Sequence, residues 1–122
     1  MILVIPESIQ KKELRPLEKY WTGDELIKIA QKVGRGLGVA LKGLEKGSLV
    51  KIDSTFGNIS TRSVFLLVTD HNEIIPIITR TKNDLVGQNL SFRNKAFEKL
   101  FWENYRLIQE DLEGGRFEVI EL

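Results

Sequence analysis

Cysteine is absent from this 122-residue chain, and histidine occurs once, at His71. The lack of cysteine excludes disulfides, thiolate metal ligands and thiol catalysis, and one histidine cannot form a cluster of histidine ligands. No apolar run approaches the roughly 18 to 20 residues of a membrane helix. The opening MILVIP is too short for a signal peptide and lacks a basic n-region. We therefore expect a cytoplasmic protein with no membrane contact, no bound metal and no cofactor.

The length indicates a single domain, and the charge distribution divides it into a basic part and an acidic part. A chain of 122 residues is long enough for one modest core and too short for two, so residues 1–122 are treated as one domain. Residues 1–96 contain 15 Lys and Arg against 10 Asp and Glu, whereas residues 97–122 contain 3 against 7. A basic body favours polyanion binding, and an acidic end favours self-masking or a basic partner. Alternatively, the acidic residues are only the solvated face of a helix: Glu98, Glu103, Glu110, Asp111 and Glu113.

Three consecutive strands are predicted in the middle of the chain. Residues 48–56 alternate between apolar and polar positions, which is typical of a half-buried strand in an antiparallel sheet. The runs at 63–69 and 74–80 are apolar on both faces and are joined by a short polar turn. We expect the three runs to pair antiparallel. Because Pro76 has no backbone N–H, the third run should be an edge strand or contain a bulge.

A helical hairpin is predicted ahead of these strands. Thr22 and Glu25 form a T-x-x-E capping box, and apolar residues recur every three or four positions from Leu26 to Leu44. A Gly-x-Gly-x-Gly string at 34–38 interrupts the stripe, and each glycine costs roughly 1 kcal/mol in a helix interior. The string follows a helical pattern rather than a strand, so it does not match a nucleotide-binding loop. It favours either a break into a hairpin or close packing of another element.

A second helix is predicted near the end of the chain. Asn94 is a suitable cap, and the apolar stripe after it ends at Gly114–Gly115. Residues 97–122 thus form an acidic C-terminal helix followed by a short strand or tail. The expected fold class is α+β, with a small antiparallel sheet of three to four strands, an N-terminal helical hairpin on one face and a C-terminal helix. The side chains predicted to face the first helix are Val50, Ile52 and Phe56.

Cationic side chains stand at the ends of the predicted strands: Lys51, Arg62, Arg80 and Lys82. Antiparallel pairing brings Arg62 and Arg80 to the same end of the sheet. Arginine offers a bidentate fork to phosphate oxygens and lysine a point charge, so this end is a candidate phosphate site. Arg93 and Lys95 are predicted as peripheral RNA contacts. The alternative is that these are ordinary solvated cations at strand ends.

Metal-independent RNA cleavage needs a base for the ribose 2′-hydroxyl, cations for the phosphate and an acid for the leaving oxygen. The four strand-end cations suit the second role. His71, in the turn between the second and third runs, is more often exposed than catalytic at such a position. Trp102 is expected on the exposed flank of the last helix, where it would suit a protein interface.

The order of elements resembles the RelE/ParE superfamily of bacterial and archaeal toxins. The residues that carry the resemblance are LVKI at 49–52 and RSVFLLVTDHNEIIPIITRTKND at 62–84, followed by NLS and a helix. The resemblance implies a toxin subunit paired with an antitoxin. Members of this superfamily that cut mRNA on the ribosome use Lys and Arg on the sheet. The resemblance would place those catalytic roles in this chain on Lys51, Arg62, Arg80 and Lys82. The chain departs from the pattern because it has no His after the third strand and its one Tyr there, Tyr105, falls on the apolar stripe of the last predicted helix. The resemblance therefore assigns no general base.

Two functions follow as hypotheses. The first is a toxin-like ribonuclease or translation inhibitor that acts on mRNA or the ribosome and is neutralised by an antitoxin, with metal-independent endoribonuclease activity as its enzymatic form. The second is a non-enzymatic binding module, either a gyrase-directed toxin of the same fold or a protein-interaction domain. Growth arrest on expression, relieved by a neighbouring gene, would separate the toxin from an unrelated module.

Overall fold

The computed structural model describes residues 1–21, 23–45, 47–56, 58–84 and 86–122, with the backbone alone at Phe56. The strands in this part of the chain are β1 (Ile2–Pro6), β2 (Val39–Leu44), β3 (Gly47–Phe56), β4 (Ile59–Val68), β5 (Glu73–Thr81) and β6 (Phe117–Glu121). The α-helices are α1 (Glu7–Ile9), α2 (Gly23–Gly34) and α3 (Lys95–Glu113). The short helical turns η1 (Gln10–Leu14) and η2 (Arg15–Leu17) continue α1, and η3 (Thr69–His71) joins β4 to β5.

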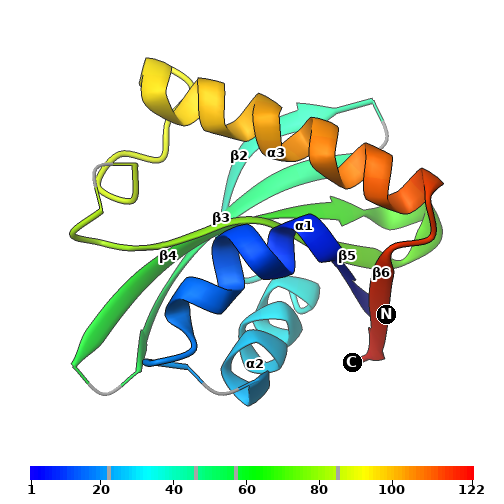
Figure 1. The fold of residues 1–122 in the computed structure, drawn as a ribbon, viewed down its shortest axis with the longest axis horizontal. Coiled ribbons are helices and arrows are strands. Elements are labelled where there is room, and N and C mark those ends of the chain that lie inside the picture. Colours follow the sequence, from blue (N-terminus) through cyan, green and yellow to red (C-terminus); the bar gives the residue numbers. More distant parts are fainter. Residues whose placement is uncertain (22, 46, 57, 85) are drawn as a thin grey trace.

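The strands form one mixed sheet in the order β2-β3-β4-β5-β1-β6 (Figure 1). β1 runs parallel to β5, and every other neighbouring pair is antiparallel. The prediction of a small antiparallel sheet of three to four strands is therefore wrong, although the class remains α+β. The physical reason is that β1 is apolar and buried along most of its length, so it lies inside the sheet between β5 and β6.

The three middle strands pair as their patterns predict. β3, β4 and β5 are consecutive antiparallel neighbours. Pro76 lies at a bulge, and β5 is not an edge strand, because β1 pairs with its first two residues; beyond Ile74 this side of β5 does not pair with β1. Val64 pairs with Ile78. The next residue, Phe65, pairs with Pro76, so Ile77 is the extra residue of the bulge.

The predicted helical hairpin is wrong, because α2 stops at Gly34 and residues 39–44 form β2. Gly36 and Gly38 have φ angles of +89° and +101°, which other residues rarely adopt. A Cβ on Gly38 would also lie 2.7 Å from Val50 Cγ1 and 2.9 Å from a backbone oxygen of β3. The glycines therefore end the helix and let the chain turn closely onto β3.

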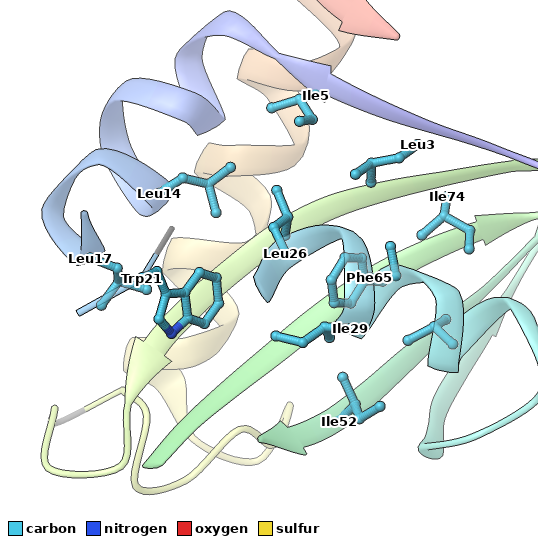
Figure 2. Packing of buried hydrophobic residues seen from close by; sticks show 12 residues of the cluster. Leu3, Ile5, Leu14, Leu17, Trp21, Leu26, Ile29, Ile52, Phe65 and Ile74 are labelled. Atoms are coloured by element: carbon cyan, nitrogen blue, oxygen red, sulfur yellow. The ribbon is translucent and has the colours of Figure 1, made fainter. Parts of the chain in front are cut away.

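The two long helices cover opposite faces of the sheet, with α3 above it and α2 below it in Figure 1. Figure 2 shows the core beneath α2, where Leu26 and Ile29 lie over Phe65 and Ile52. Ile52 thus faces α2 as predicted, and Val50 packs against the same cluster. The Phe56 side chain and the proposed cap Thr22 lie outside the described residues.

The second core lies beneath α3. Its buried residues from the helix are Phe97, Phe101 and Ile108, and those from the sheet include Leu49, Val64, Ile75, Ile77 and Ile78. Complete burial of each such side chain stabilises the fold by about 1.5 to 3 kcal/mol. The predicted C-terminal helix is confirmed, since α3 is capped by the Asn94 side chain and followed by Gly114. Within the described residues, no helix has the length and apolarity needed to cross a membrane.

Candidate functional site

The register of the sheet brings the predicted cations to one face. Asp53 of β3 pairs with Arg62 of β4, and Arg62 pairs with Arg80 of β5. Paired residues of antiparallel strands point to the same face of a sheet. That face is the one covered by α3, because Val64 and Ile78, two positions from the arginines, are buried in the core beneath α3. The predicted meeting of Arg62 and Arg80 at one end of the sheet is confirmed.

Arg80 is bound by a buried carboxylate. Its Nε donates to Glu13 Oε1 at 2.9 Å, and its Nη2 donates to Oε2 at 2.7 Å. The Glu13 side chain, from η1, is fully buried and also accepts the backbone N–H of Thr79 at 3.1 Å. The hydrogen bonds to Glu13 raise the pKa of Arg80 above its ordinary value, against the effect of burial, and Asp84 adds to this at 3.4 Å from Nη1. Arg80 therefore holds η1 against the part of β5 that does not pair with β1.

Arg62 and Lys82 lie on either side of the Asp53 carboxylate. Arg62 Nε is 3.4 Å from Asp53 Oδ1, and Lys82 Nζ is 3.4 Å from Asp53 Oδ2. Arg62 Nη1 also donates to the carbonyl oxygens of Gly87 at 3.3 Å and Gln88 at 2.9 Å, which holds it against the loop after β5. The side chains of Arg62 and Lys82 keep 28% and 40% of their surface exposed. Two cations on one carboxylate leave a net positive charge that faces solvent.

Two further lysines lie on the same face, and two more cations follow in the chain segment beside it. Lys51 is two positions from Asp53 on β3, and Lys42 of β2 pairs with Leu49, so both side chains share this face. The Lys42 ammonium lies 5.1 Å from the centre of the Phe92 ring, so the loop before α3 reaches the sheet here. The exposed residues Arg93 and Lys95 follow Phe92 along the chain. We name the set of six the basic face: Lys42, Lys51, Arg62, Lys82, Arg93 and Lys95.

The basic face carries more positive charge than its neighbours neutralise. Lys42, Lys51, Arg93 and Lys95 form no ion pair with any described residue, and Arg62 and Lys82 share Asp53. Arg80 is excluded from the set because Glu13 and Asp84 both bind it. The arrangement therefore suits a ligand with several negative charges, such as a nucleic acid backbone.

His71 is remote from these cations. It ends η3, next to the end of the β4–β5 hairpin where Val68 pairs with Glu73, whereas Arg62 and Arg80 pair toward the other end. Among the described residues, the one carboxylate that contacts Arg62 or Lys82 is Asp53. Any general base that acts beside the exposed cations would therefore be Asp53, which the sequence did not single out.

The sequence analysis also missed two polar side chains that hydrogen-bond the backbone of β5 where β1 does not pair with it. Asn104 is fully buried in α3, where its Nδ2 donates to the Ile77 carbonyl at 2.8 Å and its Oδ1 accepts from Lys12 Nζ at 2.7 Å. A signal for Asn104 exists, because it is a polar residue between Phe101 and Ile108 on the apolar side of its helix. Glu13 lies in a polar stretch and has no comparable signal.

Asp111 is not on the solvated face of the acidic helix. It is 3% exposed, and its Oδ2 accepts the backbone N–H of Ser8 at 2.7 Å while Oδ1 accepts from Arg116 Nε at 3.3 Å. Burial alone would raise the pKa of this carboxyl, but the hydrogen bonds from Ser8 and Arg116 outweigh it and lower the pKa below its ordinary value. The interpretation of the helix acids as uniformly solvated is therefore wrong for Asp111.

Comparisons with known proteins add no assignment: no family model matches the chain, and no similar curated protein or solved structure was found. The resemblance to the RelE/ParE superfamily thus stays a prediction. Across the described ranges, no group of three or more His, Asp or Glu side chains is placed to hold a metal ion. What the site offers chemically is an exposed set of cations around one carboxylate.

Proposed function

We propose that this chain is a toxin-like translation inhibitor that binds mRNA or ribosomal RNA through the basic face. The observation that carries the proposal is the placement of six cations on and beside one face of the sheet, with Asp53 as the one carboxylate of the described residues that pairs with any of them. Arginine and lysine on a sheet contact a phosphate backbone without reading bases, so the binding should depend strongly on salt. On this proposal the chain acts in the cytoplasm and a partner antitoxin neutralises it.

The carboxylates around Arg80 argue against a catalytic role for that residue. A cation that stabilises a transition state must be free to contact the reacting phosphate. The Arg80 guanidinium has its Nε and Nη2 on Glu13 and its Nη1 near Asp84, and its side chain is 25% exposed. Arg62 is about as buried as Arg80, at 28% exposed, so the difference between them is the charge of their partners. Arg62 and Lys82 share one carboxylate and Lys51 pairs with none among the described residues, so these three cations have charge left for RNA.

A second candidate function, metal-independent endoribonuclease activity, is favoured by the position of Asp53. This carboxylate lies 3.4 Å from both Arg62 and Lys82 and is 44% exposed. A carboxylate can take a proton from a ribose hydroxyl while neighbouring cations hold the phosphate. The two functions assign different roles to Asp53. If the chain is an RNA-binding inhibitor, Asp53 weakens RNA binding; if it is an endoribonuclease, Asp53 is required for cleavage.

The test is Asp53→Asn, with Asp70→Asn as a matched control of the same charge change in the exposed turn after β4. Binding to a labelled single strand of about 12 nucleotides is measured by fluorescence anisotropy at low salt. We expect Asp53→Asn to tighten binding about two- to fivefold, since it removes roughly 0.5 to 1 kcal/mol of surface repulsion. Asp70→Asn should change affinity less than Asp53→Asn does.

Gel analysis of the same RNA separates the two functions. The inhibitor proposal expects intact RNA after incubation with the wild-type protein. Cleavage by the wild type that is lost in Asp53→Asn would establish the endoribonuclease. Equal affinity changes in Asp53→Asn and Asp70→Asn would show that RNA does not bind at the basic face.

A further inference from the structure

A groove between α3 and the β2–β3 hairpin lies away from the strand ends that carry Arg62 and Lys82. It has a volume of about 390 Å³ and is lined by Leu44, Glu45, Gly47, Leu66, Trp102, Tyr105 and Gln109. The apolar floor comes from Leu44 and Leu66, which pack against the core beneath α3. The opposite wall is the aromatic side of α3. The groove thus combines an aliphatic floor with an aromatic wall, as helix-binding grooves do.

Trp102 is the most prominent side chain of this groove. Its side chain is 49% exposed, whereas the second tryptophan, Trp21, is 7% exposed. Trp102 is held in place by edge contacts with Phe101 at 5.0 Å and Tyr105 at 5.8 Å between ring centroids. A fixed, half-exposed tryptophan beside a groove loses little conformational freedom on binding, which is the property of an interface anchor.

Among the described residues, the charged side chains around the groove are mostly acidic. Glu45 lines it directly. On α3, Glu98 is four positions before Trp102 and Glu113 is four positions after Gln109, so both stand on the groove side of the helix. The exposed Lys99, three positions before Trp102, stands on that side too, so the three described carboxylates outnumber the unpaired cation there. All three carboxylates are exposed, and none forms an ion pair with a described residue. The nearby cation Arg106 is bound by Glu110 at 2.8 Å.

We propose that this groove docks a cationic, amphipathic peptide segment of a partner protein. Apolar side chains of the segment would cover Leu44, Leu66 and Trp102, and its lysines or arginines would meet the unpaired carboxylates of the rim. The charge of the rim selects this occupant over an acidic peptide, because like charges at a docking surface cost affinity and slow association. The proposal concerns a different surface from the basic face and does not depend on RNA binding.

The experiment uses a labelled, amphipathic Leu/Lys peptide of about 14 residues as the probe, with a Leu/Glu peptide of the same pattern as its control. Anisotropy should show saturable binding of the Leu/Lys peptide to the full chain. Trp102→Ala should weaken it at least tenfold, as expected for a tryptophan anchor. Tyr20→Ala is the matched control, since Tyr20 is another exposed aromatic, at 41%, and lies outside the groove.

A second variant tests the charge without altering the core. Glu45→Lys reverses an exposed rim charge and should weaken the Leu/Lys peptide severalfold while strengthening the Leu/Glu peptide. Equal binding of the two peptides, or equal effects of Trp102→Ala and Tyr20→Ala, would overturn the proposal. A tryptophan emission spectrum that shifts to the blue with protein concentration alone would overturn it as well, because the occupant would then be a second copy of this chain.

Discussion

At the residue scale, the contact with the largest consequence is the pair formed by Glu13 and Arg80. The carboxylate is fully buried and has three donors: two nitrogens of Arg80 and the backbone N–H of Thr79. Removing one partner of a buried ion pair leaves an uncompensated charge, which is far more costly than losing an exposed pair. Arg80 is therefore a stabilising residue of the fold first, whatever it does for RNA.

We predict that Arg80→Ala lowers the free energy of unfolding by about 3 kcal/mol, because Glu13 then has no counter-ion. Lys82→Ala, which removes a 40% exposed cation two positions away, should change it by less than about 0.5 kcal/mol. Urea denaturation of the two variants gives both numbers. The double variant Glu13→Gln with Arg80→Met should recover more than half of the loss. An Arg80→Ala protein as stable as Lys82→Ala would show that the pair does not stabilise the fold.

Part of this site followed from the sequence. The strand alternation and the antiparallel order were enough to predict that Arg62 and Arg80 meet, and the register confirms it. Their partners were not predictable. Glu13 is 67 positions from Arg80, and only the path of η1 along β5 brings the two together. Single-sequence patterns report periodicity within a segment and carry no information on such a contact.

At the element scale, β2 shows why the hairpin prediction failed. Leu37, Ala40, Leu41 and Leu44 stand at helical spacings, yet residues 39–44 form an edge strand with four of its six residues exposed. A bulge between Ala40 and Lys42 breaks its strand alternation as well. The apolar residues of this segment are therefore spaced as in a helix, although the segment does not form one. The glycines ahead of it decide the outcome, because they take left-handed φ angles that end α2.

We predict that Gly38→Ala destabilises the protein by about 2 kcal/mol or more, since the position combines a φ of +101° with close contact to Val50. Gly43→Ala is the matched control in β2, because a Cβ there meets nothing within 4 Å and the residue has no positive φ. Its effect on the unfolding free energy should be below about 0.5 kcal/mol. Chemical denaturation measures both. Equal losses would mean that the turn onto β3 is not fixed by Gly38.

The attachment of α3 to α1 gives a prediction about pH. Hydrogen bonds from Ser8 and Arg116 overcome the effect of burial and lower the pKa of Asp111 from its ordinary value of 3.8. A carboxyl with a lowered pKa in the folded state stabilises the fold at neutral pH and loses that contribution as the pH falls below about 4. Asp111→Asn should therefore be less stable than the wild type at pH 7, by about 1.5 to 3 kcal/mol.

The pH test compares the melting temperatures of the wild type and Asp111→Asn between pH 7 and pH 2.5. The gap between them should narrow as the pH falls through the acid range, since protonated Asp111 resembles the amide. Glu113→Asn changes an exposed acid on the same helix and should show no comparable gap at pH 7. A gap that is constant across the whole range would contradict the lowered pKa.

At the scale of the whole molecule, the two charge regions seen in the sequence become two surfaces. The basic body supplies the basic face, and two acids of α3 lie with Glu45, from the basic body, around the Trp102 groove. The mixed topology could not be read from the chain, because the parallel pairing of β1 with β5 joins segments about 70 positions apart. The pairing of β6 with β1 could not be predicted from the sequence either, although a short strand was one of the two structures expected after the last helix.

The most direct test of the central claim is the salt dependence of RNA affinity. For a labelled single strand, log affinity should fall linearly with log salt, with a slope of about −0.7 per phosphate contact. The double variant Lys51→Gln with Lys82→Gln should reduce the magnitude of the slope by about 1.4, since two contacts are lost. A matched double variant of cations outside the basic face, Lys28→Gln with Lys32→Gln on α2, should leave the slope unchanged. Equal slopes for all three proteins, or no binding at low salt, would contradict the account.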